Sequence, residues 1–267
     1  MRESRVRTAV FDQTGRVVVI TGGGTGIGRA TALLFAELGA DVVLASRKVE
    51  NLERVAEEVR ALGRTARVTQ TDVRVVEECE ALIDGTIAEL GRIDVLVNNA
   101  GGSHNHRFEA WTPDYYQNML DLNLRSVFVL SHRVAPHMEE RGSGFIVNVS
   151  SGAAAQGLPD VAPYGAAKAG VENLTKSFAA ALGPKGIRVN CVRVGAIKSE
   201  GFVRAMEKVG RDPDTVGGSA SALGRAGEPE EIAWPIVFFA SDASSYISGE
   251  TVFACGGPRS PTLPIPD

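Results

Sequence analysis

The chain has 267 residues, of which 44% are hydrophobic and 22% charged, and its formal net charge is −4. This composition is typical of a globular protein with a sizeable core, and the mixed charges argue against a basic nucleic-acid or membrane-binding surface. Three cysteines without C-x-x-C spacing argue against a disulfide framework or zinc site. The N-terminal 15 residues lack the apolar stretch of a secretory signal, and no apolar run could span a membrane. We therefore expect a cytoplasmic protein with no metal, no nucleic-acid partner and no membrane partner.

Short β-branched runs alternate with segments of helical periodicity along the chain. Seven strands are predicted, at residues 16–21, 41–46, 66–70, 93–98, 144–150, 187–192 and 251–254. Apolar residues recur at three- and four-residue steps in 50–62 and 75–90, and Gly39, Gly63 and Gly91 each follow a helical segment, where a left-handed C-cap is favoured. This alternation predicts an α/β fold: one Rossmann-type domain with a doubly wound, seven-stranded, mostly parallel sheet and helices on both faces.

The domain is expected to cover residues 1–257. Residues 196–227 follow the sixth strand, are rich in Gly, Ser, Ala and charge, and contain a short helical pattern near 202–209. In this fold class ligands bind beyond the carboxyl ends of the strands, so we interpret this segment as a substrate lid, with a disordered surface loop as the alternative. Residues 258–267 contain four prolines and are expected to form an extended tail, lying over the surface or on a neighbouring subunit.

A glycine-rich turn, T-G-G-G-T-G-I-G at residues 21–28, joins the first strand to a helix. Gly22, Gly26 and Gly28 allow a tight turn and close approach of backbone N–H groups to a diphosphate, and the helix N-terminus favours negative charge. The position of this turn after the first strand predicts dinucleotide binding. The alternative is a tight strand–helix turn without a ligand.

The residues after the second and third strands bear on the choice of cofactor. Ser46 and Arg47 offer a hydroxyl and a guanidinium where an NAD-binding chain would offer a carboxylate, which favours the 2′-phosphate of NADP(H) over NAD(H). Solvated charges at a strand end are the alternative. Asp72, after the third strand, is expected to accept a hydrogen bond from the adenine amino group.

Tyr164 and Lys168 are four residues apart and are expected to share one face of a helix. An ammonium beside a phenol should lower the phenol pKa from its usual value of about 10, which suits general acid–base catalysis. Ser151 ends the fifth strand, where its hydroxyl could bind a substrate oxygen. Asn123 lies in a helical pattern and is expected to mark a local break and to hold a water. Each residue taken singly has an ordinary structural alternative. Tyr164 and Lys168 could lie on a solvated helix face, Ser151 could form a turn, and Asn123 could be a polar helix residue.

With these motifs, the chain resembles the short-chain dehydrogenase/reductase family over roughly residues 14–257. The matching motifs are T-G-x-x-x-G-x-G at 21–28, N-N-A-G at 98–101, N-L at 123–124, S-S-G at 150–152 and Y-x-x-x-K at 164–168. The thirteen-residue step from Ser151 to Tyr164 is the family's usual spacing and selects Ser151 over Ser150. The resemblance implies a catalytic tetrad of Asn123, Ser151, Tyr164 and Lys168. It also implies a homotetramer, with a dimer as the alternative.

The residues and the resemblance together give a set of expected cofactor contacts. They are Gly22, Thr25, Gly26, Ile27, Gly28, Ser46, Arg47, Asp72, Val73, Asn99, Ala100, Gly101, Tyr164, Lys168, Gly195 and Ile197. Two positions depart from the family pattern. Val194 replaces a proline, which leaves the path of the following loop open. Thr25 replaces a basic residue that many NADP-preferring members carry, so that Arg47 must carry most of the discrimination between NADP(H) and NAD(H).

The resemblance implies interconversion of a carbonyl and a secondary alcohol by hydride transfer. In this scheme Ser151 orients the carbonyl, Tyr164 donates the proton, Lys168 lowers the pKa of Tyr164, and Asn123 with a water replaces the proton. Residues 45–48 and 173–177 are similar to 3-oxoacyl-ACP/CoA reductases and related enoyl-CoA reductases of fatty acid metabolism. A 3-oxoacyl thioester is therefore the leading substrate. The alternatives are a sugar, polyol or steroid alcohol dehydrogenase, an enoyl-CoA reductase and, remotely, a non-catalytic cofactor-binding regulator.

The wall of the substrate pocket is expected to include Ser103, His104, His106, Phe108, Leu158 and residues 196–222. His104 and His106 lack a cysteine or carboxylate partner of clear spacing, so we interpret them as loop residues rather than metal ligands.

Overall fold

The computed structural model describes residues 8–103 and 105–257, and seven strands within them form a single sheet. Their order is β3-β2-β1-β4-β5-β6-β7, and each neighbouring pair is parallel. The strands are β1 (Val17–Thr21), β2 (Asp41–Ser46), β3 (Ala66–Gln70), β4 (Val95–Asn98), β5 (Gly144–Ser151), β6 (Ile187–Val194) and β7 (Thr251–Ala254). The predicted fold is confirmed. The expectations for His104, for the tail 258–267 and, in the N-terminal segment, for residues 1–7 concern residues outside the described ones.

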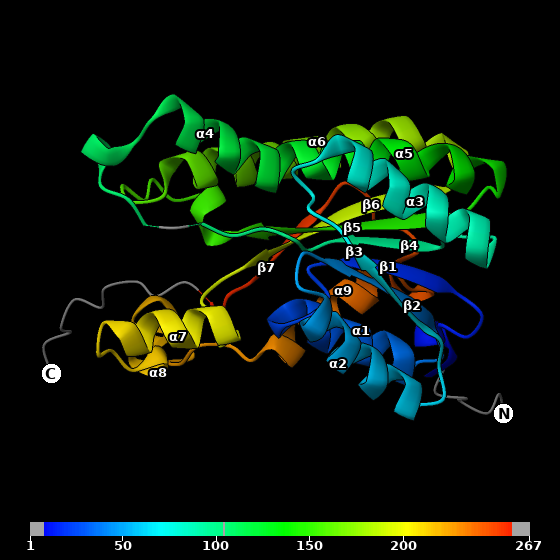
Figure 1. Cartoon of the computed structure of the whole chain (residues 1–267), viewed down its shortest axis with the longest axis horizontal. Helices are drawn as coiled ribbons and strands as arrows, with labels where there is room; N and C mark the ends of the chain where they lie inside the picture. The colour runs from blue at the N-terminus through cyan, green and yellow to red at the C-terminus, as the bar shows by residue number, and fades with distance from the viewer. Residues whose placement is uncertain (1–7, 104, 258–267) are drawn as a thin grey trace, which may run out of the picture.

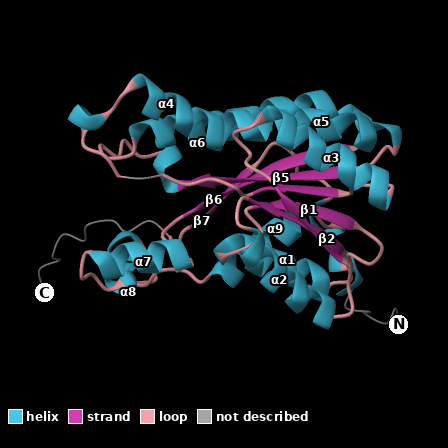
Figure 2. Ribbon diagram, viewed as in Figure 1, coloured by secondary structure: helices cyan, strands magenta, loops and turns pink. Residues whose placement is uncertain are grey.

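Helices cover both faces of the sheet (Figures 1 and 2). One layer contains α3, α4, α5 and α6, and the other contains α1, α2 and α9. The helices are α1 (Gly26–Glu37), α2 (Val49–Ala61), α3 (Val76–Leu90), α4 (Pro113–Leu120), α5 (Ser126–Glu140), α6 (Ala162–Leu182), α7 (Glu200–Lys208), α8 (Pro213–Ala220) and α9 (Pro229–Phe239). No helix within 8–103 and 105–257 has the length and hydropathy needed to cross a bilayer.

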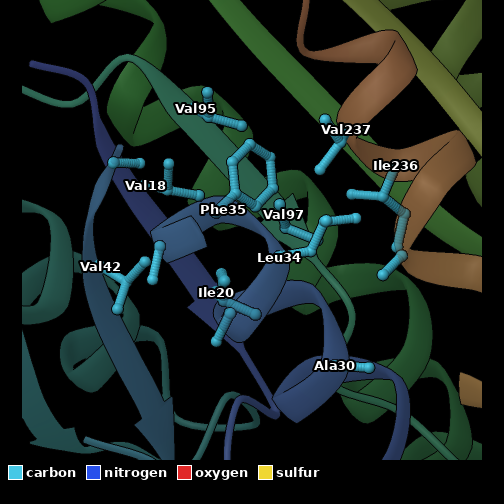
Figure 3. Packing of buried hydrophobic residues seen from close by; sticks show 14 of the residues in the cluster. Val18, Ile20, Ala30, Leu34, Phe35, Val42, Val95, Val97, Ile236 and Val237 are labelled. Carbon is cyan, nitrogen blue, oxygen red and sulfur yellow. The ribbon is translucent and has the colours of Figure 1, made fainter. Parts of the chain in front are cut away.

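The two hydrophobic cores lie on opposite faces of the sheet because successive strand side chains point to opposite sides. Val18 and Ile20 of β1 pack in the cluster under α1, α2 and α9, whereas Val17 and Val19 pack in the cluster under α3 and α5. Figure 3 shows Phe35 of α1, fully buried, among valines of the sheet and of α9. β1 is buried on both faces, and its carboxyl end is thereby held in place for the glycine-rich turn.

Strand β6 runs two residues further than the sequence pattern predicts, to Val194. Val194 pairs in register with Ser151 of β5 and with Ala254 of β7. A proline at this position would have no N–H to contribute and is disfavoured inside a sheet, whereas a β-branched valine fits it. With Val194 in the strand, the following loop begins at Gly195.

Candidate active site

The glycine-rich turn between β1 and α1 is closely packed against the residues after β4. Gly22 and Gly26 have φ of +67° and +50°, values that favour glycine. A Cβ at Gly28 would lie 2.1 Å from the carbonyl oxygen of Gly22, so no side chain fits there. The Asn99 side-chain amide donates to the carbonyl of Thr21 at 2.9 Å. The turn is therefore fixed in shape, and the N-terminus of α1 opens beside it.

Asn123 lies in a π-helical turn, residues 121–125, between α4 and α5. Such turns interrupt α-helices mostly at functional sites, and the local break predicted at this residue is present. The side chain is fully buried, and it accepts from the N–H of Gly102 at 2.9 Å and donates to the carbonyl of Gly102 at 3.0 Å. A Cβ at Gly101 would lie 2.7 Å from Asn123 Oδ1 and 3.1 Å from Lys168 Nζ. The loop after β4 therefore passes between these two side chains.

Ser151 and Tyr164 come together from the end of β5 and the first turn of α6. Ser151 caps the short 3-10 turn Gly152–Ala154 by accepting from the N–H of Ala153 at 3.3 Å. The chain then returns to α6, and Tyr164 lies near enough to Ser151 for the serine side chain to lower the pKa of the phenol. Burial raises the pKa of Tyr164, and the interaction with Ser151 partly offsets this. The phenol is therefore protonated at neutral pH.

The expectation that Lys168 lowers the pKa of Tyr164 is wrong for the protein by itself. Lys168 Nζ donates to the carbonyl of Val149 at 2.8 Å and lies 5.8 Å from the centre of the Tyr164 ring. The lysine is only 3% exposed, and burial lowers its pKa to about 8. Burial of both groups therefore outweighs the attraction that the spacing of the two residues suggested.

The buried lysine makes stability depend on pH in a defined window. Between pH 8 and 10.5 the unfolded chain binds a proton at residue 168 that the folded chain does not, so folding becomes more favourable as pH rises. Relative to Lys168→Met, the wild-type free energy of unfolding should rise by about 3 kcal/mol across this window and stay level below it. Urea unfolding of both proteins from pH 7 to 10.5 measures the difference. A difference independent of pH would contradict the assigned burial.

An ion pair braces the ends of β5 and β6 against α6. Arg193 Nε donates to Glu172 at 2.7 Å, its Nη2 pairs with the second carboxylate oxygen, and Ser150 Oγ donates to the same carboxylate at 2.7 Å. Burial alone would raise the pKa of Glu172, but the bonds from Arg193 and Ser150 outweigh it and hold the pKa below its usual value. Because Arg193 directly precedes Val194, this pair fixes the start of the loop that lacks the family proline.

Two cavities follow the carboxyl edge of the sheet. The glycine-loop cavity has a volume of about 570 Å³, and the neighbouring Arg47 cavity about 280 Å³. Every residue expected to contact the cofactor lines one or both. The Arg47 cavity contains Ser46, Arg47, Asp72 and Val73, and the glycine-loop cavity contains Gly26, Ile27, Gly28, Asn99, Tyr164, Lys168, Gly195 and Ile197; Gly22, Thr25, Ala100 and Gly101 line both.

Asp72 has a partner that the sequence did not suggest. Its two carboxylate oxygens accept from the guanidinium of Arg74, the closest contact being 2.6 Å, and this bond lowers the pKa of Asp72. Arg47 is exposed, and its guanidinium has no hydrogen bond or ion pair among the described residues.

A third space, the Ser151 cavity, lies beside the glycine-loop cavity and has a volume of about 410 Å³. The two share Val194, Gly195 and Ala196. No charged side chain of the described residues lines the Ser151 cavity. Its wall is made of Ser151, Gly152, Ala153, Gln156, Leu158, Val194, Gly195, Ala196, Gly217, Ser219, Ala220, Ser221, Phe253, Cys255 and Gly257.

The expected pocket wall is matched only in part. Leu158 and part of 196–222 line the Ser151 cavity, whereas His106 and Phe108 line none of the three cavities. The His106 ring packs against Tyr115 with 4.7 Å between ring centres, and Phe108 packs against Trp111 at 5.2 Å. These aromatic contacts pack the loop before α4 against its own residues and against the start of α4. Among residues 8–103 and 105–257, no group of three metal-ligating side chains occurs.

The glycine-loop cavity also contains Ser199, Phe202 and Arg204, which were expected in the substrate wall as part of 196–222 but not among the cofactor contacts. Ser199 caps α7 by accepting from the N–H of Phe202 at 3.3 Å, and a serine before a helical pattern is a signal that could have located this helix start. Arg204 had no local signal, because its approach to the cavity depends on where α7 lies in the fold.

The segment 196–227 is tied at its two ends. Ile197 and Gly227 form a parallel β-bridge, and the N–H of Gly227 donates to the carbonyl of Ala196 at 3.0 Å. Lys198 pairs with Asp214 at 3.2 Å and with Glu228 at 2.5 Å. Helices α7 and α8 lie between these ends, beyond the carboxyl ends of β6 and β7 (Figure 1). The segment 196–227 therefore forms two short helices between two paired ends, and not the disordered surface loop that was the alternative expectation.

Comparisons with known proteins agree on the family. A family model described as enoyl-(acyl carrier protein) reductase matches residues 22–258. The 3-oxoacyl-[acyl-carrier-protein] reductase FabG of Thermotoga maritima is 37% identical, covering 91% of this chain and 97% of that protein. The probable galactose dehydrogenase GalD of Rhizobium meliloti is also 37% identical, covering 92% and 96%.

A solved structure of a 7α-hydroxysteroid dehydrogenase, complexed with NADH and 7-oxoglycochenodeoxycholic acid, superposes with a TM-score of 0.87. It is 34% identical and covers 93% of this chain and 96% of that one. The chain therefore belongs to the short-chain dehydrogenase/reductase family and is an NAD(P)-dependent oxidoreductase that acts on CH–OH and C=O groups.

Proposed function

We propose that the protein interconverts a ketone and a secondary alcohol at the hydroxyls of Ser151 and Tyr164, with NADP(H) as the preferred cofactor. One observation carries this proposal: Tyr164 and Ser151 interact where two adjoining cavities meet, because Tyr164 lines the glycine-loop cavity and Ser151 lines the Ser151 cavity. A substrate oxygen held by both hydroxyls would stand where the two spaces meet.

The residues around this point supply binding and proton transfer. Ser151 donates a hydrogen bond that orients the substrate oxygen and stabilises negative charge developing on it. Tyr164, whose raised pKa keeps its Oη protonated, gives its proton to that oxygen in the reductive direction. Lys168 donates a hydrogen bond to the carbonyl of Val149 at the wall of the glycine-loop cavity, and Asn123 donates one to the carbonyl of Gly102 in the same wall. The segment 196–227 acts as the lid of the Ser151 cavity.

Together, the glycine-loop cavity and the Arg47 cavity fit a nicotinamide dinucleotide. The tight turn leaves no space for side chains at Gly22 and Gly28, so a diphosphate can approach backbone N–H groups at the N-terminus of α1. The glycine-loop cavity reaches Tyr164 on one side, and the Arg47 cavity extends it on the other. Hydride transfer is the chemistry that the nicotinamide ring supplies when the cofactor is bound.

Preference for NADP(H) rests on Arg47, whose exposed guanidinium lines the cavity assigned to the adenosine half and makes no hydrogen bond or ion pair within the described part of the chain. Arg47→Ala should raise the Kd for NADPH by about 10–100-fold, because charged hydrogen bonds contribute ~1.5–3 kcal/mol. The Kd for NADH should change by less than about threefold. Nucleotide fluorescence titrations measure both. Arg54→Ala, an exposed arginine of α2 outside the cavities, is the control; equal losses for the two nucleotides would contradict the assignment.

For the substrate we propose a 3-oxoacyl thioester, in line with the name of the Thermotoga maritima relative. A ketone of a steroid type is the second candidate. The Ser151 cavity favours it, because its described wall carries no charge and its volume of about 410 Å³ lies in the range of small-molecule pockets. The solved relative in complex with a 7-oxo bile-acid conjugate also supports it.

A substrate panel tests this function. Absorbance of NADPH and of NADH is followed with acetoacetyl-CoA, crotonyl-CoA and 7-oxo bile acids, and reduction of NADP⁺ and NAD⁺ with galactose. Oxidation of NADPH with acetoacetyl-CoA would support the leading substrate, and oxidation with the bile acids alone would support the second. Turnover of crotonyl-CoA alone would show an enoyl reductase, and no turnover with any ketone or alcohol would overturn the proposal.

We also propose a homotetramer. Large apolar side chains are exposed on two separate regions, with Phe128 on α5 and Trp234, Val252 and Phe253 on α9 and the edge strand β7. Two separate apolar faces per subunit are what a symmetric tetramer needs, whereas a dimer needs one. Light scattering after size-exclusion chromatography measures the mass; a dimer or monomer would contradict this.

A further inference from the structure

Arg204 of α7 lies where two cavities meet. It lines both the glycine-loop cavity and the Arg47 cavity. The other residues common to both are Gly22, Thr25, Ala100 and Gly101, which belong to the glycine-rich turn and the loop after β4. A dinucleotide that occupies the two cavities must pass this shared wall with its diphosphate, because the diphosphate joins its two halves.

The N-terminus of α7 is packed directly on the glycine-rich turn. A Cβ at Gly26 would lie 2.8 Å from Cβ of Ser199 and 3.5 Å from Oε2 of Glu200. Arg204 is four residues after Glu200 and therefore lies one turn further on the same face of the helix. Figure 1 shows α7 on the same side of the sheet as α1. The face of α7 that carries Arg204 thus faces the N-terminus of α1.

The charges at the shared wall point to an anion. Arg204 is the only basic side chain among the described residues of that wall; Arg47 and Lys48 line only one cavity, and Lys168 only the other. The Arg204 guanidinium has no hydrogen bond or ion pair in the part of the chain that the structure describes, and it is exposed. Glu200, one turn before Arg204, brings a carboxylate to the same helix; its Oε2 is buried without a hydrogen-bond partner among the described residues, and Arg29 of α1 attracts it.

We propose that Arg204 binds the diphosphate of the dinucleotide and so fastens the lid segment 196–227 to the bound cofactor. This inference rests on the dinucleotide binding proposed above. The stem of the lid is held by the Ile197–Gly227 bridge within the chain itself, whereas α7 would meet the cofactor through Arg204. A guanidinium suits a diphosphate because its planar donors match paired phosphate oxygens. Cofactor binding would then hold α7, and with it the lid, against the glycine-rich turn.

The test compares Arg204→Met with Lys208→Met, which removes the same charge from the same helix one turn away at a position outside the cavities. Kd values for NADPH and NADH are measured by nucleotide fluorescence, without turnover. For Arg204→Met we expect both Kd values to rise by about tenfold or more and by the same factor, since both nucleotides contain the diphosphate. Lys208→Met should leave both unchanged.

The other outcomes each overturn the proposal. A loss confined to NADPH would assign Arg204 to the 2′-phosphate instead. Equal losses in the two variants would show a general effect of charge, and no loss in Arg204→Met would show no contact. If the wild type binds neither nucleotide, the proposed function fails together with this inference; if it binds normally and Arg204→Met does too, only this inference fails.

Limited proteolysis measures directly whether a bound cofactor protects the lid segment 196–227 through Arg204. Thermolysin is suitable, because trypsin would lose its own cleavage site in the variant. Saturating NADPH should slow cleavage within 196–227 in the wild type and in Lys208→Met, and should protect Arg204→Met much less at equal saturation. Arg204→Lys, which keeps the charge, should retain part of the affinity and of the protection. Equal protection of all the variants would contradict the link between Arg204 and the lid.

Discussion

Replacing Tyr164 with phenylalanine is expected to lower kcat by about 10²–10⁴-fold, the usual contribution of a positioned general acid or base. The phenol hydroxyl is the proton-donating group proposed to meet the substrate oxygen beside Ser151, where the two cavities adjoin. The ring is kept, so packing and cofactor binding should change little. The turnover measurement uses the substrate that the panel identifies.

Two further readings make the Tyr164 result specific. The Kd for NADPH should stay within about twofold of wild type, which separates loss of chemistry from loss of binding. Tyr246→Phe, a fully exposed tyrosine far along the chain, should have wild-type turnover. A Tyr164→Phe enzyme that keeps more than a tenth of the wild-type kcat would remove Tyr164 from the role proposed here.

Replacing Gly28 with alanine is expected to abolish tight cofactor binding, raising the Kd of both nucleotides by about tenfold or more. The added methyl would lie 2.1 Å from the carbonyl oxygen of Gly22 and 2.8 Å from Nδ2 of Asn99. The nearest atom belongs to the backbone and cannot move aside as the end of a flexible side chain can. The glycine-rich turn itself must therefore shift. The same overpacking should lower the free energy of unfolding by about 1–3 kcal/mol.

Gly183→Ala is the matched control, because an added Cβ there meets nothing within 4 Å and its φ is not in the left-handed region. It should leave affinity and stability nearly unchanged. Nucleotide titration and thermal unfolding, run on both variants, give the comparison. Normal nucleotide affinity in Gly28→Ala would show that the diphosphate does not rest on this turn.

The fold and much of the site could be predicted from the sequence because they depend on local patterns. Strands buried on both faces appear as nearly continuous apolar runs, as in residues 17–20, and parallel strands place their carboxyl ends at one edge. Residues at the ends of strands, such as Ser46, Asn99 and Ser151, could therefore be assigned to one site before any coordinate was known. A glycine run between a strand and a helix has the same local character.

Burial and long-range partners could not be predicted in this way. The spacing of Tyr164 and Lys168 indicated a shared helix face, but the pKa of each depends on how much of the chain covers it, and here burial is the first cause of both shifts. Asp72 was expected to be available to a ligand, but it pairs with Arg74 only two residues away, a local contact that the sequence pattern did not indicate. The substrate wall was misjudged at His106 and Phe108, which pack against other aromatic rings of their own loop and helix.

The sequence by itself determined the sheet, the glycine-rich turn and the residues at its edge, because strand and helix periodicities and turn residues act over a few neighbours. The tertiary structure decided three other features: the Glu172–Arg193 ion pair next to Val194, the uncharged Ser151 cavity, and the place of Arg204 beside the glycine-rich turn. Each of these joins residues from separate elements, and their approach is set by how the layers and the segment 196–227 pack, which no local pattern records.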